Sequence, residues 1–428
     1  MRQGYKRAAW GQIPQEWDTP YLGDIFIFKN GLNKAKEFFG RGTPIVNYMD
    51  VYRSRRLNSG DLLGRVTLNR QELNNFEVRK GDVFFTRTSE TAAEVGITSV
   101  MLDDTIDTVF SGFVLRARPK DNSLVDQFKK YCFSTIEVRR QITSQSSETT
   151  RALTNGRSLA AVSIARPTKV EQEAIAEALS DADALIESLE QLIAKKHLIK
   201  QGAMQELLTG KKRLPVFEVK PGFKKSEVGL IPEDWLISKI DDFCVVIRGA
   251  SPRPKGDKRF YGGSIPRLMV EDVTRDGKTV IPQIDFLTEE GVKRSRPCKK
   301  GTLTIVCSGT VGIPSFLGVD ACIHDGFLAL VSIRKSISDE YLYHQLCRLR
   351  ESFESSATHG GIFTNLTTSG VREFKLLIPS SKDEQDAIAT ILSDMDSEII
   401  VLETKLNKAL QVKQGMMQEL LTGRIRLV

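Results

Sequence analysis

The chain has 428 residues, of which 40% are hydrophobic and 27% charged. This length and composition are typical of a globular protein of two or three domains and exclude a disordered chain, a collagen and a small disulfide scaffold. The chain has 61 basic and 54 acidic residues, and the resulting net charge of +7 favours a polyanionic partner. No apolar run suits a membrane helix, no signal peptide is evident and the six cysteines are scattered, so we expect a cytoplasmic protein with reduced thiols.

Residues 1–170 are predicted to form a mixed α/β domain. Short apolar runs at 83–86 and 112–115 predict strands, and a helix is expected over 126–140. Basic runs in the expected loops are most often solvated surface but also suit phosphate contacts, and polar residues that follow strands are placed to read base edges. The candidate DNA-binding residues of this domain are Lys34, Arg53, Arg55, Arg56, Arg87, Ser89 and Arg151.

A central helix is predicted over 171–210. Apolar residues recur at heptad spacing over about five heptads, the pattern of a coiled coil, and Gly210 suits the end of a helix. The apolar stripe is expected to include Leu185, Leu192 and Ile199. Its core candidates are Ile175, Leu179, Ala182 and Leu189.

Residues 211–383 are predicted to contain a linker and a second mixed α/β domain. Apolar runs at 303–306 and 327–331 predict strands, and a helix is expected over 338–352. Basic runs at 253–259 and 293–300 again suit phosphate contacts. The candidate DNA-binding residues here are Arg253, Lys255, Lys258, Arg259, Lys293, Arg296, Ser308, Thr310 and His359.

The last predicted element is a C-terminal helix over 384–428, with an apolar stripe expected to reach Val412. Its core candidates are Ile388, Leu392, Met395 and Leu402. Residues 171–214 and 384–427 align without a gap, and 25 of the 44 positions are identical.

A weaker repeat opens each half of the chain. Gly11-x-Ile13-Pro14-x-x-Trp17 matches the pattern at 229–235, and residues 110–113 align with 324–327. The chain is therefore a duplication in which the helices agree and the globular parts diverge. We expect the helices to share one task, and each globular part to have its own.

The polar outer surfaces of the two helices are also repeated. A helix–helix seam requires only apolar residues at the right spacing, so identical polar residues outside it favour two docking sites for the same partner. Gly202 and Gly415, unfavourable within helices, suggest close approach of another backbone. The partner-docking candidates are Lys200, Gln201, Gln205, Glu206, Lys413, Gln414, Gln418 and Glu419.

Catalytic motifs are missing from the sequence. It contains no P-loop, no G-x-G-x-x-G, no G-x-S-x-G and no Asn-Pro-Pro-aromatic motif of amino-methyltransferases. Two E-x-K-like fragments at 77–79 and 218–220 are common by chance, and Cys298, Cys307, Cys322 and His324 fit no usual zinc spacing. We therefore predict neither a catalytic residue nor a metal site.

The repeated motifs resemble those of specificity subunits of Type I restriction–modification systems. The resemblance rests on Gly-x-Ile-Pro-x-x-Trp at 11–17 and 229–235, E-Q-x-x-I-A-x-x-L-S-x-x-D at 171–183 and 384–396, and K-Q-G-x-M-Q-E-L-L-T-G at 200–210 and 413–423. It covers essentially the whole chain, and the paired helical motifs are specific to this family.

The resemblance implies an α/β protein with two target-recognition domains, separated by two conserved helices packed as an antiparallel coiled coil with pseudo-two-fold duplication. Each domain would read one half of a split double-stranded DNA target, with the helix length setting the gap. Two modification (methyltransferase) subunits would dock on the helices, and restriction subunits would complete the complex. S-adenosylmethionine and ATP would be bound by those partners, and this chain would need no cofactor.

Two alternatives share parts of this pattern. An orphan or inactive DNA-binding competitor of such a complex would have the same sequence features, and its neighbouring genes would distinguish it. An enzyme with a catalytic site in one globular part would act on DNA without any partner.

Overall fold

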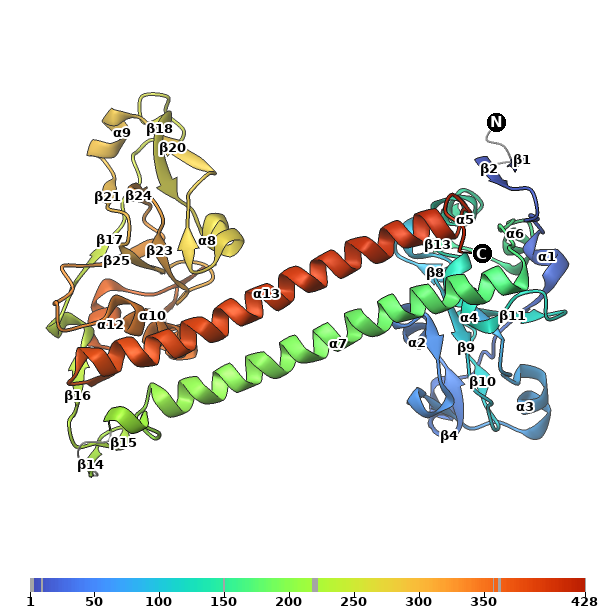
Figure 1. Cartoon of the computed structure of the whole chain (residues 1–428), viewed down its shortest axis with the longest axis horizontal. Helices are drawn as coiled ribbons and strands as arrows, with labels where there is room; N and C mark the ends of the chain where they lie inside the picture. The colour runs from blue at the N-terminus through green and yellow to red at the C-terminus, as the bar shows by residue number, and fades with distance from the viewer. Residues whose placement is uncertain are drawn as a thin grey trace. The chain divides into compact units, whose positions relative to one another are not determined.

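The computed structural model describes residues 4–8, 11–148, 151–217, 222–356, 358–360 and 363–427. The chain folds into two compact mixed α/β units (Figure 1). Unit 1 comprises Met1–Glu190 with Thr404–Val428, and unit 2 comprises Gln191–Glu403. Each unit therefore contains one globular domain and a stretch of both long helices, a division that differs from the four consecutive segments expected from the sequence. None of the helices in the described ranges is long and apolar enough to cross a bilayer.

Unit 1 also includes the last part of α13 Lys382–Leu420, which follows unit 2 in the chain. Its strands are β1 Tyr5–Ala8, β2 Gly11–Pro14, β3 Phe26–Asn30, β4 Phe39–Val46, β5 Arg56–Leu57, β6 Arg65–Val66, β7 Val83–Thr86, β8 Thr88–Ser89, β9 Thr98–Met101, β10 Val109–Phe110, β11 Val114–Pro119, β12 Ser147–Glu148 and β13 Ala152–Leu153. Its helices are α1 Leu22–Ile25, α2 Tyr48–Arg53, α3 Arg70–Phe76, α4 Asp126–Cys132, α5 Ile136–Ser144, α6 Gly156–Ala160 and the first part of α7 Lys169–Leu207.

Unit 2 repeats this arrangement with a different set of loops. Its strands are β14 Phe223–Ser226, β15 Gly229–Pro232, β16 Trp235–Lys239, β17 Val245–Arg248, β18 Tyr261–Leu268, β19 Thr279–Val280, β20 Asp285–Leu287, β21 Arg296–Cys298, β22 Leu303–Val306, β23 Pro314–Leu317, β24 Ala321–Ile323, β25 Phe327–Val331, β26 Thr358–Gly360, β27 Phe363–Asn365 and β28 Lys375–Pro379. Its helices are α8 Val270–Asp276, α9 Glu289–Lys293, α10 Asp339–Arg348, α11 Arg350–Ser356, α12 Thr368–Glu373 and the first part of α13 Lys382–Leu420.

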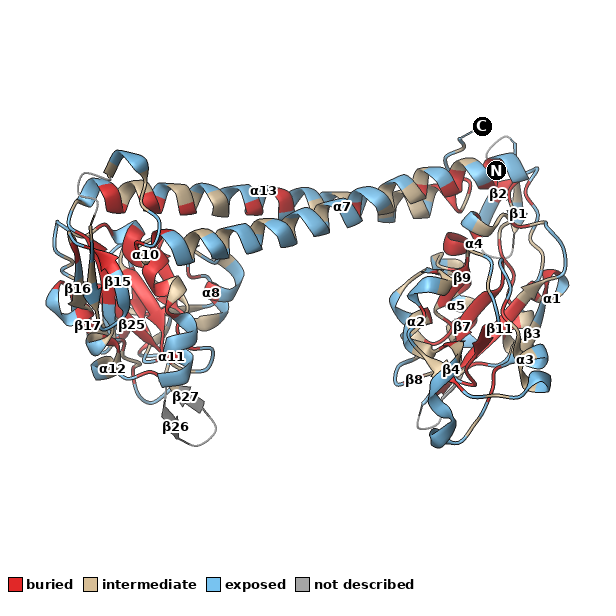
Figure 2. Cartoon of the chain, turned by 90° about the horizontal axis from the view of Figure 1, so that it is seen from below, coloured by how far each residue is buried: buried red, intermediate tan, exposed pale blue. Residues whose placement is uncertain are grey.

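The central sheet has the same strand order in both units. It runs β3-β11-β7-β9-β5 in unit 1 and β17-β25-β22-β23-β19 in unit 2, and in each the last pair is parallel while the others are antiparallel. The middle strands β7 and β22 are buried along their whole length, which explains their continuous apolar runs. Figure 2 shows the buried residues gathered on these strands. The duplication therefore extends from sequence to topology.

The structure corrects three details of the sequence analysis. The helix expected over 126–140 is two helices, because Thr135 caps α5 by accepting a hydrogen bond from the Val138 amide at 3.3 Å. The helix expected over 338–352 is likewise divided between α10 and α11. The alignment of 110–113 with 324–327 is wrong by one residue: the Arg87 and Cys307 amides donate to the carbonyls of Phe113 and Gly326, which are therefore equivalent.

The long helices α7 and α13 each contain 39 residues and begin two residues earlier than predicted. Of the predicted core residues, Ala182, Leu189 and Met395 are only partly buried. The others are buried, namely Ile175, Leu179, Ile388, Leu392 and Leu402.

One flank of the predicted stripe is exposed rather than buried. The exposed fractions are 54% for Leu185, 38% for Leu192, 46% for Ile199 and 52% for Val412. Leu179, a predicted core residue, is buried in the core of unit 1, and Ile186, which lies beside Leu185, is also buried, so the buried stripe is narrower than predicted.

Equivalent ion pairs join the two long helices within each unit. Asp183 pairs with Lys413 in unit 1, and Asp396 pairs with Lys200 in unit 2. In unit 2, Lys196 also pairs with Glu398 at 2.6 Å. Residue numbers rise along α7 while they fall along α13, so the helices are antiparallel there.

The repeated Glu-Gln at the start of each long helix fastens that helix to its domain. Glu171 accepts hydrogen bonds from Trp17 Nε1 at 2.7 Å and from Arg426, while Glu384 accepts one from Arg213 Nη2 at 2.7 Å. Both carboxylates are buried.

The neighbouring glutamines make matching contacts with each domain. Gln172 Oε1 accepts a hydrogen bond from the Val125 amide at 2.8 Å, and Gln385 Oε1 accepts one from the Ser338 amide at 2.9 Å. The repeated motif therefore has a structural explanation.

The helix ends explain the second repeated motif. Gly210 and Gly423 both have φ of +70°, a left-handed conformation that glycine adopts without strain. Each packs on the proline and tryptophan of the Gly-x-Ile-Pro-x-x-Trp pattern, Gly210 on 232 and 235 in unit 2, and Gly423 on 14 and 17 in unit 1. The two repeated motifs thus contact each other within each unit.

A buried histidine marks a difference between the two domain–helix junctions. In unit 1, Tyr131 donates a hydrogen bond to Asp183 Oδ2 at 2.7 Å. The equivalent residue of unit 2 is His344, whose Nε2 lies 3.0 Å from Ser393 Oγ. Burial lowers the pKa of His344 to about 4, and the nearby charge of Lys278 acts in the same direction. His344 is therefore neutral at neutral pH.

This histidine predicts acid sensitivity in unit 2. Between about pH 6.5 and about pH 4 the unfolded chain binds a proton that the folded unit does not. The free energy of unfolding therefore decreases as the pH is lowered through this range, by up to about 3 kcal/mol. His344→Tyr, which introduces the unit 1 residue, should remove that loss. Urea unfolding at about pH 7 and about pH 4.5 measures it. Tyr131→His is the matched control and should make unit 1 acid-sensitive; equal acid losses in wild type and His344→Tyr would contradict the assignment.

Candidate nucleic-acid interface

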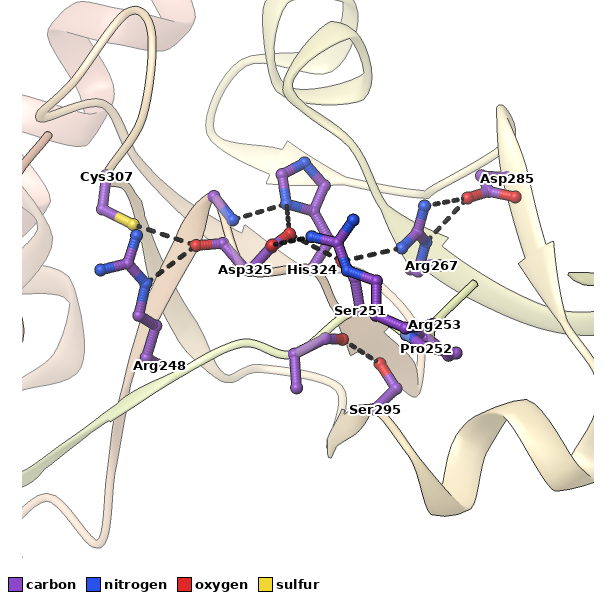
Figure 3. Close-up of polar contacts among 12 residues, drawn as sticks. Arg248, Ser251, Pro252, Arg253, Arg267, Asp285, Ser295, Cys307, His324 and Asp325 are labelled. Carbon is purple, nitrogen blue, oxygen red and sulfur yellow. Dashed lines mark hydrogen bonds and ion pairs between the residues drawn. The ribbon is translucent and has the colours of Figure 1, made fainter. Parts of the chain in front are cut away.

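A cluster of polar side chains lies where loops of unit 2 meet at the ends of the central strands. It combines the loop after β17, strand β18 and the turn between β24 and β25 (Figure 3). The cluster borders a cavity of about 200 Å³. The cavity is lined by Ser251, Arg253, Lys255, Tyr261, Arg267, Met269, His324 and Asp325.

Asp325 is the acidic centre of this cluster. Its carboxylate accepts a hydrogen bond from Ser251 Oγ at 2.6 Å and lies 3.5 Å from Arg253 Nη2. Burial opposes its ionisation, but the Ser251 hydrogen bond and the Arg253 charge contribute to a net lowering of the pKa of Asp325. Because the side chain is half exposed, an ionised acceptor is available to an approaching ligand. Carboxylates of this kind accept hydrogen bonds from base amino groups.

Arg267 supports the cluster from beneath. Its side chain is 4% exposed, and its Nε donates to Asp285 at 2.7 Å while Nη1 donates to Ser251 Oγ at 3.1 Å. Tyr261 lies under the guanidinium and donates a hydrogen bond to the Pro252 carbonyl at 2.7 Å. Arg267 therefore fixes the loop that carries Ser251 and Arg253, and its own charge is already neutralised by Asp285.

His324 faces the same cavity as a neutral side chain. Its Nδ1 accepts the Gly326 amide at 2.6 Å, which leaves Nε2 as the protonated nitrogen and donor. Burial lowers the pKa of His324. His324 Nδ1 lies 3.4 Å from Asp325 Oδ1, so the cavity is lined by a neutral imidazole, an anionic acceptor and the exposed Arg253.

The equivalent position of unit 1 has different chemistry. Gly112 stands where unit 2 has Asp325, and a Cβ built on Gly112 would collide with Asn33 Oδ1. The Asn33 amide therefore fills the place of a side chain at residue 112. Lys34 beside it is ion-paired with Glu72 at 2.6 Å. A neutral amide thus replaces the carboxylate of unit 2.

The other sequence-predicted residues of unit 1 fall into two groups. Arg87 donates to the Gly112 carbonyl at 3.4 Å and so belongs to the Asn33 site. Ser89 is buried and donates to Glu94, and Arg151 is exposed.

The basic residues after α2 form the second group. Arg55 donates to Met417 Sδ at 3.3 Å, and Arg56 lies 3.5 Å from Glu187, so this run faces the long helices. Arg53 belongs to the same run. The structure does not bring them together with Asn33.

In unit 2, Arg253 and Lys255 line the cavity beside Asp325, and Lys258 is exposed in the same loop. Arg259 is ion-paired with Asp257 at 2.7 Å. Arg296 donates to the Arg248 carbonyl at 3.3 Å.

The last candidates of unit 2 lie at other positions. Lys293 ends α9 exposed, Ser308 bridges to Asn365, and Thr310 is exposed in the next turn. The backbone of His359 lies in β26, but its side chain is outside the described residues.

The docking candidates lie on α7 and α13. Lys200 and Lys413 are ion-paired across the helices, which gives both a role within the chain. Gln201, Gln205 and Glu206 are exposed, as are Gln414 and Gln418, while Glu419 is half-buried. A Cβ at Gly202 or Gly415 would meet no atom of the chain within 4 Å, so the close backbone approach suggested for them does not occur within this chain.

Sequence reasoning missed Asn33, Ser251 and Asp325. None belongs to a basic run, and only long-range strand pairing brings Ser251 to Asp325. Among the described residues, no group of three or more His, Cys, Asp or Glu side chains is placed to hold a metal ion.

Known proteins share this architecture. The family model of the Type I restriction modification DNA specificity domain matches the chain twice, over residues 14–195 and 232–412. A Methanocaldococcus jannaschii protein named as the MjaX specificity subunit of a type I restriction enzyme is 24% identical over 99% of this chain and 97% of its own length. The MjaVIII specificity subunit of that organism is 23% identical over 99% of this chain and 96% of its own. A solved S subunit from M. genitalium has a TM-score of 0.57 at 16% identity, covering 94% of this chain and 96% of that one.

Proposed function

Because the chain belongs to the Type I restriction–modification DNA specificity family, whose subunits recognise DNA and are not catalytic, we propose that its two domains read the two halves of a split, asymmetric target in double-stranded DNA. The main support for this proposal is that the two domains share one architecture but have different polar sites. Unit 2 offers the Asp325 carboxylate with Arg253, while unit 1 offers the Asn33 amide with Arg87. Carboxylate, guanidinium and amide groups favour different base edges, which supports two unlike half-sites.

We further infer that α7 and α13 pack as one antiparallel coiled coil related by a pseudo-two-fold axis, whose length sets the gap between the half-sites. The equivalent ion pairs Asp183–Lys413 and Asp396–Lys200 support this arrangement, because each residue of one pair lies 213 positions from its counterpart in the other. Each helix, at 39 residues, is roughly 58 Å long. Half-sites on one face of B-DNA lie about 34–36 Å apart, a separation of the same order.

The helices are also the proposed docking sites for two modification subunits. Repeated polar residues and large exposed apolar side chains support this role, since such apolar surface favours burial by a partner. The exposed apolar residues of the helices include Leu185, Leu192, Leu198, Ile199, Ile400, Val401, Leu410 and Val412. In this proposal the partners bind S-adenosylmethionine and ATP, and restriction subunits join the full complex in the cytoplasm.

The direct test is a base-modification map of a methylation-free host that expresses this chain with its cognate modification subunit. We expect a split, two-part methylated motif that disappears when the chain is omitted. Methylation that is unchanged without the chain, or absent with it, would contradict the proposal and favour the competitor alternative.

Asp325 is expected to specify one base of the second half-site. Asp325→Ala should weaken binding of the assembled complex to its target by about 10- to 100-fold, since one base contact is worth about 1–3 kcal/mol. Asp325→Asn should change the preferred base at one position and leave the first half-site unaltered. Asp320→Asn is the matched control, because Asp320 is exposed and pairs with Lys299 outside this cluster. A uniform loss over all sequences would contradict base reading.

If the repeated polar residues of the two long helices are the docking sites, substitutions at each site should remove one modification subunit without removing the other. Gln205→Lys combined with Glu206→Lys should remove one, and Gln418→Lys with Glu419→Lys the other, each weakening its site by about tenfold or more through the altered charge. Mass photometry of the assembled complex counts the bound subunits. Gln283→Lys with Glu290→Lys makes the same charge change at exposed side chains away from the two long helices and should assemble fully. Full assembly of all variants would contradict docking at these patches.

A further inference from the structure

A basic pocket lies in unit 1 between the loop after α2, helix α4 and the long helices. Its volume is about 520 Å³. Five cationic side chains line it against three carboxylates. The cations are Arg53, Arg55, Arg56, Lys130 and Lys413, and the carboxylates are Asp183, Glu187 and Glu190. The pocket is thus distinct from the polar site around Asn33.

Part of this charge is neutralised within the unit. Lys413 is ion-paired with Asp183, and Arg56 lies 3.5 Å from Glu187. Arg55 donates to the sulfur of Met417 at 3.3 Å, which carries no charge. The pocket therefore keeps an excess of positive charge.

Lys130 lines the pocket and is only 7% exposed. Its ammonium donates to Gln127 Oε1 at 3.2 Å and to Ser180 Oγ at 3.1 Å, both neutral acceptors. Within the described ranges it has no ion pair with a carboxylate. Burial lowers the pKa of Lys130, Asp183 opposes this effect, and the charges of Arg56 and Lys413 lower it further. A buried ammonium without a paired anion is costly, and a bound anion would relieve that cost.

The equivalent place in unit 2 lacks this excess. Strand register makes Lys278 equivalent to Arg55, and Tyr343 takes the position of Lys130. Lys278 is ion-paired with Glu340 at 2.6 Å and stacks over the Tyr343 ring. The shared architecture therefore does not require the basic pocket, since unit 2 forms the same junction with a neutralised lysine.

We propose that this pocket of unit 1 binds a phosphate group through Lys130, Arg55 and Arg53. Guanidinium groups match phosphate oxygens with paired donors, and the buried ammonium supplies a point charge. The phosphate comes either from a DNA backbone or from free phosphate in solution. Only the first source rests on the proposed function.

The test uses the full chain, with inorganic phosphate as the probe and chloride at matched ionic strength as the reference. Phosphate should raise the Tm of the wild type by about 2–4 °C through binding to the folded state. Lys130→Met should lose that rise, and Arg55→Ala should reduce it. Lys405→Met removes an exposed lysine of α13 within unit 1 and should keep the full rise.

Each outcome decides the proposal. An equal rise in wild type, Lys130→Met and Arg55→Ala, or no rise in any, overturns the site. If Lys130→Met fails to fold, Arg55→Ala decides alone, because its side chain is only partly buried.

A second measurement identifies the source of the phosphate. Binding to a duplex without the target motif is followed against salt concentration. A salt slope about one unit smaller in Lys130→Met assigns the phosphate to the DNA backbone. An unchanged slope, with the phosphate effect on Tm lost, assigns it to free phosphate. The modification map is independent of both results, so a failure of this site and a failure of the proposed function are distinguishable.

Discussion

A buried carboxylate at the start of each long helix ties it to the residues that follow the other. Glu171, the third residue of α7, binds Arg426 beyond the end of α13, and Glu384, the third residue of α13, binds Arg213 beyond the end of α7. Removing one partner of such a pair leaves a charge in the protein interior, at a cost of about 3–5 kcal/mol. Within each unit, this contact therefore fixes the start of one long helix beside the end of the other. It also holds the globular domain at that helix start.

The contrast between junctions and loops explains how one fold carries two chemically different polar sites. The junction residues repeat with an offset of 213 positions in the helices, from the Glu-Gln pair to the glycine that ends each helix. The loops at the far ends of the central strands carry unlike groups, Asp325 in one unit and Gly112 with Asn33 in the other. Loop substitutions change what a site offers without disturbing the strands beneath.

The sequence was sufficient for the duplication, both long helices and two central strands of each sheet, β7 and β11 in unit 1 and β22 and β25 in unit 2, because heptad spacing and buried apolar runs are local signals. The sequence was insufficient where the burial or the alignment of a residue depends on contacts with residues far away in the chain. Which flank of the helix stripe is buried depends on the partner helix, so Leu185 and Leu192 were misplaced. The one-residue error before β11 arose because strand pairing, not sequence likeness, makes Phe113 equivalent to Gly326. The basic runs led to the prediction of Arg55 and Arg56 as DNA-binding residues. The polar site of unit 2 instead has an aspartate, Asp325, at its centre.

The composition of unit 1 has a consequence for synthesis of the chain. Its core includes Leu420 and Leu421, packed with Ile13 and Trp17, whereas unit 2 is one continuous stretch. At about 5–20 residues per second, a ribosome needs roughly 10–40 s to make the intervening segment. During that interval the N-terminal domain has its apolar helix-binding surface uncovered, and unit 2 can complete its core first. The half of the protein that is made first is therefore finished last.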